Sequence, residues 1–136
     1  MHTTIVPDTL DFFPLLAEST LPAFLATQGR GFTVATDTVI NDERGVFLGQ
    51  RLSRGNSYLQ WLDSSKVTQA YITDADIQLT HGLRVGMTKL QVQQRLGLTS
   101  LPPDTLSFDT GYMSNHCTLF FRQNRLHTVS LEDMPD

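Results

Sequence analysis

The sequence predicts an α+β fold: an antiparallel sheet of about six strands, covered by N-terminal helices and by one short capped helix, 88–97. Three observations support this prediction. Hydrophobic residues fall near a 3.6-residue spacing in the first 30 positions and alternate with polar residues from Phe32 onward. Short polar segments separate the alternating runs at nearly even intervals, which is typical of an antiparallel meander. Between positions 82 and 97, helix start and stop signals interrupt the alternation.

The composition is that of an ordinary globular protein, and it excludes several classes. A chain of 136 residues suits one domain, 1–136, and 40% hydrophobic with 18% charged residues argues against intrinsic disorder. The net charge is −4 and the lysines and arginines are scattered singly, so neither nucleic acid nor an anionic membrane surface is an expected partner. A single cysteine excludes an internal disulfide and a cysteine-based zinc site.

The sequence contains no evident targeting or membrane signal. No apolar run approaches the ~20 residues that a spanning helix needs. Asp8, Asp11 and Glu18 interrupt the apolar stretches near the N-terminus, so this segment is not a secretion signal. We therefore expect a soluble protein. A periplasmic or other extracytoplasmic location stays open for a chain whose signal has been removed, and the sequence does not predict the oligomeric state.

Residues 1–30 are expected to form one or two short helices that cover the sheet. Leu10, Phe13 and Leu16 lie near helical spacing, although Pro14 divides that segment. A second helix is expected to begin at Thr20 and to end before the glycines at 29 and 31.

Residues 31–80 are expected to form a β-meander. Apolar and β-branched residues alternate through four runs, and short turns between them favour antiparallel pairing of consecutive strands. A fifth, short extension is expected at Ile77–Leu79. The four runs begin at Phe32, Val46, Tyr58 and Lys66, and the last three end at Leu52, Leu62 and Ile72.

Residues 81–136 are expected to form the capped helix followed by a β-hairpin. Thr88 and Gln91 have the spacing of a capping box, and Gly86 and Gly97 bound the helical segment on either side. About two turns of helix are unstable alone in water, so this helix must pack on the sheet.

The side chains for that packing are Val92 and Leu96, which lie four residues apart. Three further strands are expected after the helix, at 106–108, 117–122 and 125–131. A tight turn at Gln123–Asn124, with Asn124 at positive φ, joins the last two.

No catalytic residue, metal site or cofactor is predicted. Asp74, Asp76 and Gln78 begin like a calcium loop, but the glycine and the terminal glutamate of such a loop are missing, so a turn between strands is favoured. The glycines near Arg30 and those at 82 and 86 lack the residues of a phosphate-binding loop.

The cysteine and the histidines give no local site either. His116 and Cys117 are adjacent on an expected strand and point to opposite faces, so they do not form a nucleophile–base pair, and Cys117 is expected to be a small buried hydrophobe. His81, His116 and His127 lack the spacing of a local metal site.

Aromatic side chains on the expected strands are the best candidates for a binding surface. Exposed aromatic residues on a sheet are strong anchors for a protein partner. For Trp61, packing in the core is the favoured alternative, because large aromatic side chains are usually buried. The candidate surface consists of Tyr58, Trp61, Tyr71 and Phe120.

Residues 77–131 resemble a pattern of small bacterial extracytoplasmic domains. Its elements here are Leu83, the run Val85–Lys89, Gln91–Val92, Leu96–Gly97 and the hairpin around Leu119–Phe121. The segment is similar to the SmpA/OmlA family of small outer-membrane lipoproteins of the barrel-assembly machinery, and more broadly to β-lactamase-inhibitor-protein-like domains. This resemblance implies a short helical element on an antiparallel sheet and a role in protein binding.

The preferred hypothesis is a non-catalytic protein–protein interaction module of the inhibitor, immunity or assembly type. The alternative is a small-ligand-binding protein or small hydrolase with a site between the sheet and the N-terminal helices. That alternative predicts a cavity in which at least two of five side chains converge, namely His81, His116, His127, Asp74 and Asp76. A structural domain cut from a larger protein is a third possibility, with a bare hydrophobic edge as its mark.

Overall fold

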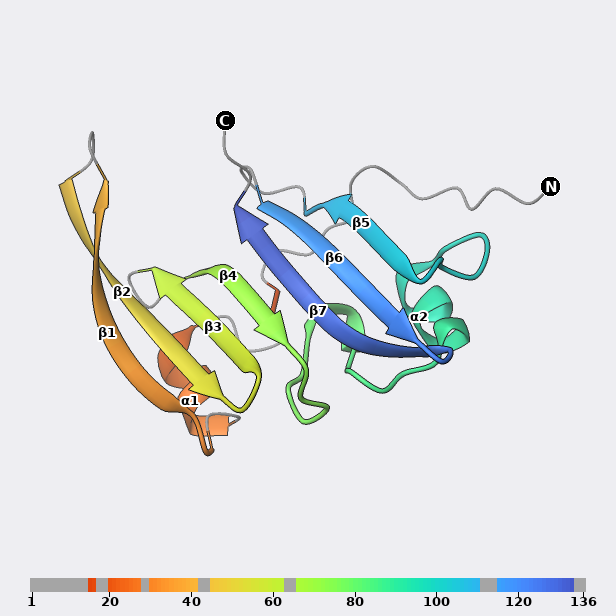
Figure 1. Cartoon of the computed structure of the whole chain (residues 1–136), viewed down its shortest axis with the longest axis horizontal. Coiled ribbons are helices and arrows are strands. Elements are labelled where there is room, and N and C mark those ends of the chain that lie inside the picture. Colours follow the sequence, from red (N-terminus) through yellow and green to blue (C-terminus); the bar gives the residue numbers. More distant parts are fainter. Residues whose placement is uncertain are drawn as a thin grey trace.

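The computed structural model describes residues 15–16, 20–27, 30–41, 45–62, 66–110 and 115–133, which form a seven-stranded antiparallel sheet with helices (Figure 1). This confirms the expected α+β class, with seven strands in place of about six. The strands are β1 (Thr33–Asn41), β2 (Gly45–Arg54), β3 (Ser57–Leu62), β4 (Lys66–Ile72), β5 (Thr105–Asp109), β6 (Asn115–Arg122) and β7 (Arg125–Asp133). The helical elements are α1 (Leu21–Thr27), the 3₁₀ turn η1 (Thr80–Gly82) and α2 (Lys89–Leu96).

The strand order is β1-β2-β3-β4-β7-β6-β5, so the sheet consists of two meanders joined side by side. The chain leaves the sheet after β4, passes through η1 and α2, and returns at the far edge as β5 (Figure 1). The two meanders meet where β4 pairs with β7, with Tyr71 opposite Ser130. Ile77–Leu79, expected as a strand extension, does not join the sheet. Leu79 makes only an isolated bridge with Leu16.

One face of the sheet carries the hydrophobic core. Alternation along the strands places a cross-strand row of apolar residues on this face. Leu21 and Phe24 of α1 and Val92 of α2 belong to the same buried cluster, so both helices cover this face. Figure 1 shows α1 behind β2 and β3, and α2 beside the ends of β5, β6 and β7. The row consists of Leu52, Leu59, Ala70, Leu131, Cys117 and Phe108.

The α2 helix has the capping box that its sequence indicates. The Gln91 N–H donates to Thr88 Oγ1 at 3.2 Å, and the Thr88 N–H donates to Gln91 Oε1 at 2.9 Å. Gly97 ends the helix in the left-handed conformation, with φ 69°. Val92 is fully buried, which contributes about 1.5–3 kcal/mol and fixes α2 on the sheet.

The turn before α2 is hydrogen-bonded to the β6–β7 hairpin. The Gly86 N–H donates to the Leu126 carbonyl, and the Leu126 N–H donates to the Met87 carbonyl, both at 2.7 Å. Gly86 has φ 102°, a conformation that a residue with a Cβ rarely adopts. The hairpin turn itself has φ 52° at Gln123 and 67° at Asn124, the two successive positive values of a type I′ turn.

Of the N-terminal helices, the structure describes α1. The Ala23 N–H donates to Thr20 Oγ1 at 3.3 Å, so Thr20 caps this helix as its sequence position suggests. The first expected helix, with Leu10 and Phe13, lies outside the described residues. Leu15 and Leu16 are described and buried.

Candidate functional site

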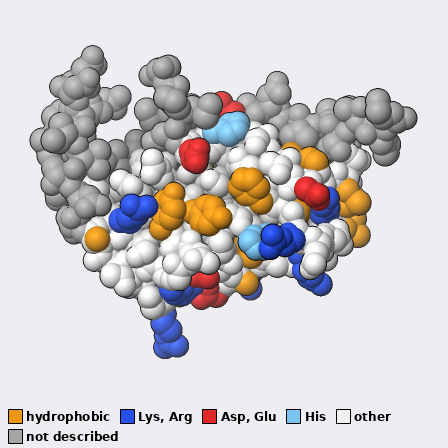
Figure 2. Space-filling model, viewed as in Figure 1, with side chains coloured by type: hydrophobic (Ala, Val, Ile, Leu, Met, Phe, Trp, Pro, Cys, Tyr) orange, Lys and Arg blue, Asp and Glu red, His pale blue; other side chains and the backbone are white. Residues whose placement is uncertain are grey.

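The face of the sheet opposite α1 and α2 is not covered by any described helix or strand, and we call it the open face. Figure 2 views the molecule from this side, with hydrophobic side chains gathered across the middle and Lys or Arg side chains on both flanks. Strand pairing arranges a row of tyrosine and hydroxyl side chains across six strands. In spatial order the row is Ser53, Tyr58, Tyr71, Ser130, Thr118 and Ser107.

Two tyrosines form the aromatic centre of the open face. The Tyr58 and Tyr71 rings are stacked, with centroids 6.2 Å apart and planes 13° from parallel. The Arg51 guanidinium lies 4.5 Å from the centroid of the Tyr58 ring, a cation–π arrangement. Tyr71 and Phe120 are each 38% exposed. The stacked pair is therefore held in place before any partner binds.

A shallow depression of about 290 Å³ adjoins Tyr71 on the open face. Phe120 and Phe121 are adjacent on β6, so alternation points them to opposite faces: Phe121 is buried and Phe120 is exposed. The register of β6 and β7 shifts at this point and leaves His127 of β7 without a paired residue on β6. His127 Nδ1 lies 2.7 Å from Thr128 Oγ1 within the depression. The lining consists of Tyr71, Phe120, Phe121, Arg122, His127 and Thr128.

Trp61 is not part of this surface. Its side chain is 1% exposed and its ring centroid lies 6.2 Å from that of Phe24, so it belongs to the core. Alternation explains the difference, because Tyr58 and Trp61 are three positions apart and point to opposite faces. The Trp61 Nε1–H has no hydrogen-bond partner within the described part of the chain.

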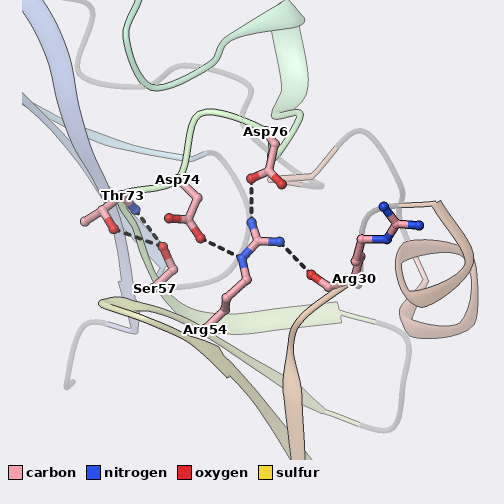
Figure 3. A network of polar contacts seen from close by, with 6 residues as sticks. All are labelled: Arg30, Arg54, Ser57, Thr73, Asp74 and Asp76. Atoms are coloured by element: carbon pink, nitrogen blue, oxygen red, sulfur yellow. Dashed lines mark hydrogen bonds and ion pairs between the residues drawn. The ribbon is translucent and has the colours of Figure 1, made fainter.

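Asp74 and Asp76 converge on Arg54 rather than on a calcium site (Figure 3). Arg54 Nε donates to Asp74 Oδ2 at 2.9 Å, Nη2 pairs with Asp76, and Nη1 donates to the Arg30 carbonyl at 2.7 Å. Burial alone lowers the pKa of the Arg54 guanidinium, but hydrogen bonds and charges from Asp74 and Asp76 outweigh it and raise this pKa overall. The guanidinium also lies 4.5 Å from the ring centroid of Phe32.

The histidines are separated in the structure. His81 lies in η1, His116 on β6 and His127 on β7, and the described residues contain no group of three or more His, Cys, Asp or Glu side chains that could hold a metal ion. Cys117 is fully buried on the core face, as expected, and burial raises the pKa of its thiol.

A second, larger hollow of about 580 Å³ lies around η1 and α2. Of the five polar side chains that the small-ligand alternative would bring together, this hollow contains His81 and the depression on the open face contains His127. Neither of these two described hollows brings together two of the five side chains, and neither is lined by described residues of α1. The hollow is lined by Gln78, Leu79, Thr80, His81, Gly82, Leu83, Arg84, Met87 and Arg95, a group that the sequence patterns did not indicate.

Comparison with protein-family models, with curated proteins and with solved structures found no significant match for this chain. The fold and the geometry of its surfaces therefore carry the functional argument. Within the described ranges, no helix has both the length and the apolar character needed to cross a membrane.

Proposed function

We propose that this protein is a non-catalytic protein-binding module that uses the open face of its sheet to contact another protein. The observation that carries the proposal is the aromatic centre of that face, where Tyr71 and Phe120 are each 38% exposed and Tyr58 is stacked against Tyr71. Partner side chains that cover such rings gain both apolar contact and hydrogen bonds, which is why Tyr is enriched at binding hot spots.

The surroundings of these rings have the composition of a protein interface. Arg51 and Arg122 flank the aromatic centre, and the hydroxyls of Ser130 and Thr118 lie in the same cross-strand row as Tyr71. An aromatic centre with arginine and a polar rim is the usual anatomy of a non-obligate interface. The inhibitor, immunity and assembly types remain within the proposal, as does the kinship of residues 77–131 with SmpA/OmlA-like lipoproteins or β-lactamase-inhibitor-protein-like domains.

The test compares surface variants in a native pull-down. The double variant Tyr71→Ser/Phe120→Ser removes two anchors from the open face, and a partner captured by the wild type is expected to bind it at least tenfold more weakly, since each anchor contributes about 1–2 kcal/mol. Leu90→Ser is the matched control, because Leu90 is a 55% exposed apolar residue on α2, away from the open face.

The control is expected to retain the partner with unchanged affinity. The proposal is wrong if no partner is captured, or if the double variant binds the partner as tightly as the wild type does. Emission from Trp61, the single tryptophan, checks that each variant is folded.

A further inference from the structure

The hollow around η1 and α2 has a basic rim and an apolar floor. Arg84 and Arg95 are exposed at the rim, and Leu79 and Leu83 are buried, at 1% and 0% exposure. Its volume, about 580 Å³, lies within the range of small-molecule sites. It shares no described lining residue with the depression on the open face, so the two hollows are separate places in the fold.

The two arginines at the rim have no charge partner among the described residues. Neither guanidinium has a hydrogen bond or ion pair with a described residue, whereas Arg54 has two carboxylate partners. None of the described residues that line the hollow is acidic, although the whole chain has a net charge of −4. A locally unneutralised basic hollow attracts anions.

The backbone at the rim approaches one of these arginines closely at Gly82. A methyl group added at Gly82 would come within 3.1 Å of Arg95 Nη1, so the glycine leaves room for the guanidinium beside η1. His81, the preceding residue, has φ 61° and ψ 15°, a left-handed conformation that costs a residue with a side chain free energy. Strain of this kind concentrates at ligand-binding positions, and here it falls on the rim of the hollow.

We propose that this hollow binds the oxyanion head, carboxylate or phosphate, of a small organic anion. Arg84 and Arg95 contact the head, because the planar guanidinium matches both oxyanions in bidentate geometry. The apolar body of the ligand lies against the half-buried Met87 and the edges of the buried Leu79 and Leu83. An inorganic anion alone would make no use of the apolar surface that Met87 offers in the hollow.

The test is calorimetric titration of the wild-type protein at low ionic strength with three probes: phenyl phosphate, benzoate and benzamide. Benzamide has the shape of benzoate without its charge. At least one of the two anions is expected to bind with one-to-one stoichiometry, and benzamide at least tenfold more weakly than that anion. The tighter of the two anions identifies the head group.

Variants then locate the site. Arg84→Gln and Arg95→Gln are each expected to weaken binding of the tighter anion about tenfold. Arg30→Gln is the matched control, with the same change in charge at an exposed arginine that lines neither described hollow, and it is expected to bind normally. The proposal is overturned if neither anion binds at millimolar concentration, if benzamide binds equally well, or if Arg30→Gln has the same effect as the rim variants. Because Arg30, Arg84 and Arg95 are all exposed, the three variants are expected to fold.

Discussion

At the scale of single residues, Cys117 shows how burial sets the chemistry of a side chain. It lies opposite Leu131 and Phe108 in the apolar row of the core face and has 0% exposure. Burial in this row raises the pKa of its thiol, because a thiolate would lose its hydration without gaining a charged partner. His116, next to it in the chain, points to the other face of the sheet.

The raised pKa of Cys117 predicts a loss of stability at alkaline pH. In the unfolded chain the thiol ionises near 9.0, so above that pH the unfolded state binds fewer protons than the folded state, and the free energy of unfolding falls as pH rises. One pH unit above it, the loss is about 1.4 kcal/mol. Cys117→Ala lacks this contribution, so the stability difference between wild type and variant is expected to shrink from neutral pH to about pH 10.

Urea unfolding at several pH values, followed by Trp61 emission, measures this difference. In the same preparations, the folded wild type is expected to leave a thiol reagent unreacted and the unfolded chain to react fully. A stability difference that stays constant with pH would contradict the prediction.

At the scale of elements, α2 depends on its caps. The helix has eight residues, and a helix of that length does not persist alone. Both of its ends are satisfied by local groups: the Thr88–Gln91 capping box at the start and left-handed Gly97 at the end. The caps and the burial of Val92 together fix the position of α2. They thereby place Arg95 at the rim of the hollow around η1 and α2.

Thr88→Ala is expected to lower the free energy of unfolding by about 1 kcal/mol, because the Gln91 N–H loses its acceptor. Gln94→Ala, at an exposed position of the same helix, is the control and is expected to change stability by less than about 0.5 kcal/mol. Urea midpoints for the two variants provide the measurement, and equal midpoints would show that the cap contributes nothing.

Elements of this kind were predictable because their signals are local. The capping box lies within four residues, the β6–β7 turn within two, and the alternation of each strand within its own run. The aromatic surface was predictable in part, because Tyr58, Tyr71 and Phe120 do lie on the open face. Tyr58 and Trp61 are three positions apart on β3, so alternation alone could have shown that they point to opposite faces. The hollow around η1 and α2 was not predictable, because it depends on how residues 78–95 fold back on themselves.

At the scale of the whole molecule, Arg54 connects segments that are far apart in the chain. Its guanidinium binds the Arg30 carbonyl before β1 and the carboxylates of Asp74 and Asp76 after β4, so it fastens both ends of the first meander (Figure 3). The sequence places Arg54 in an expected turn, and no local pattern pairs it with residues 20 and 22 positions away. Contacts of this kind follow from strand order, which local patterns do not specify.

Arg54→Met is expected to lower the free energy of unfolding by about 2 kcal/mol, because Asp74 loses a donor in a partly buried contact and the Arg30 carbonyl loses a donor at the surface. Arg54→Lys is the matched variant. It keeps the charge but has a single ammonium, which does not reach two carboxylates and a carbonyl in the same geometry, so an intermediate loss of about 1 kcal/mol is expected. Urea unfolding followed by Trp61 emission measures both losses. Equal stability of Arg54→Met and the wild type would contradict the prediction. It would mean that the cost of removing the guanidinium from water equals the free energy gained from its three partners, and that strand pairing alone holds the two ends of the β1–β4 meander.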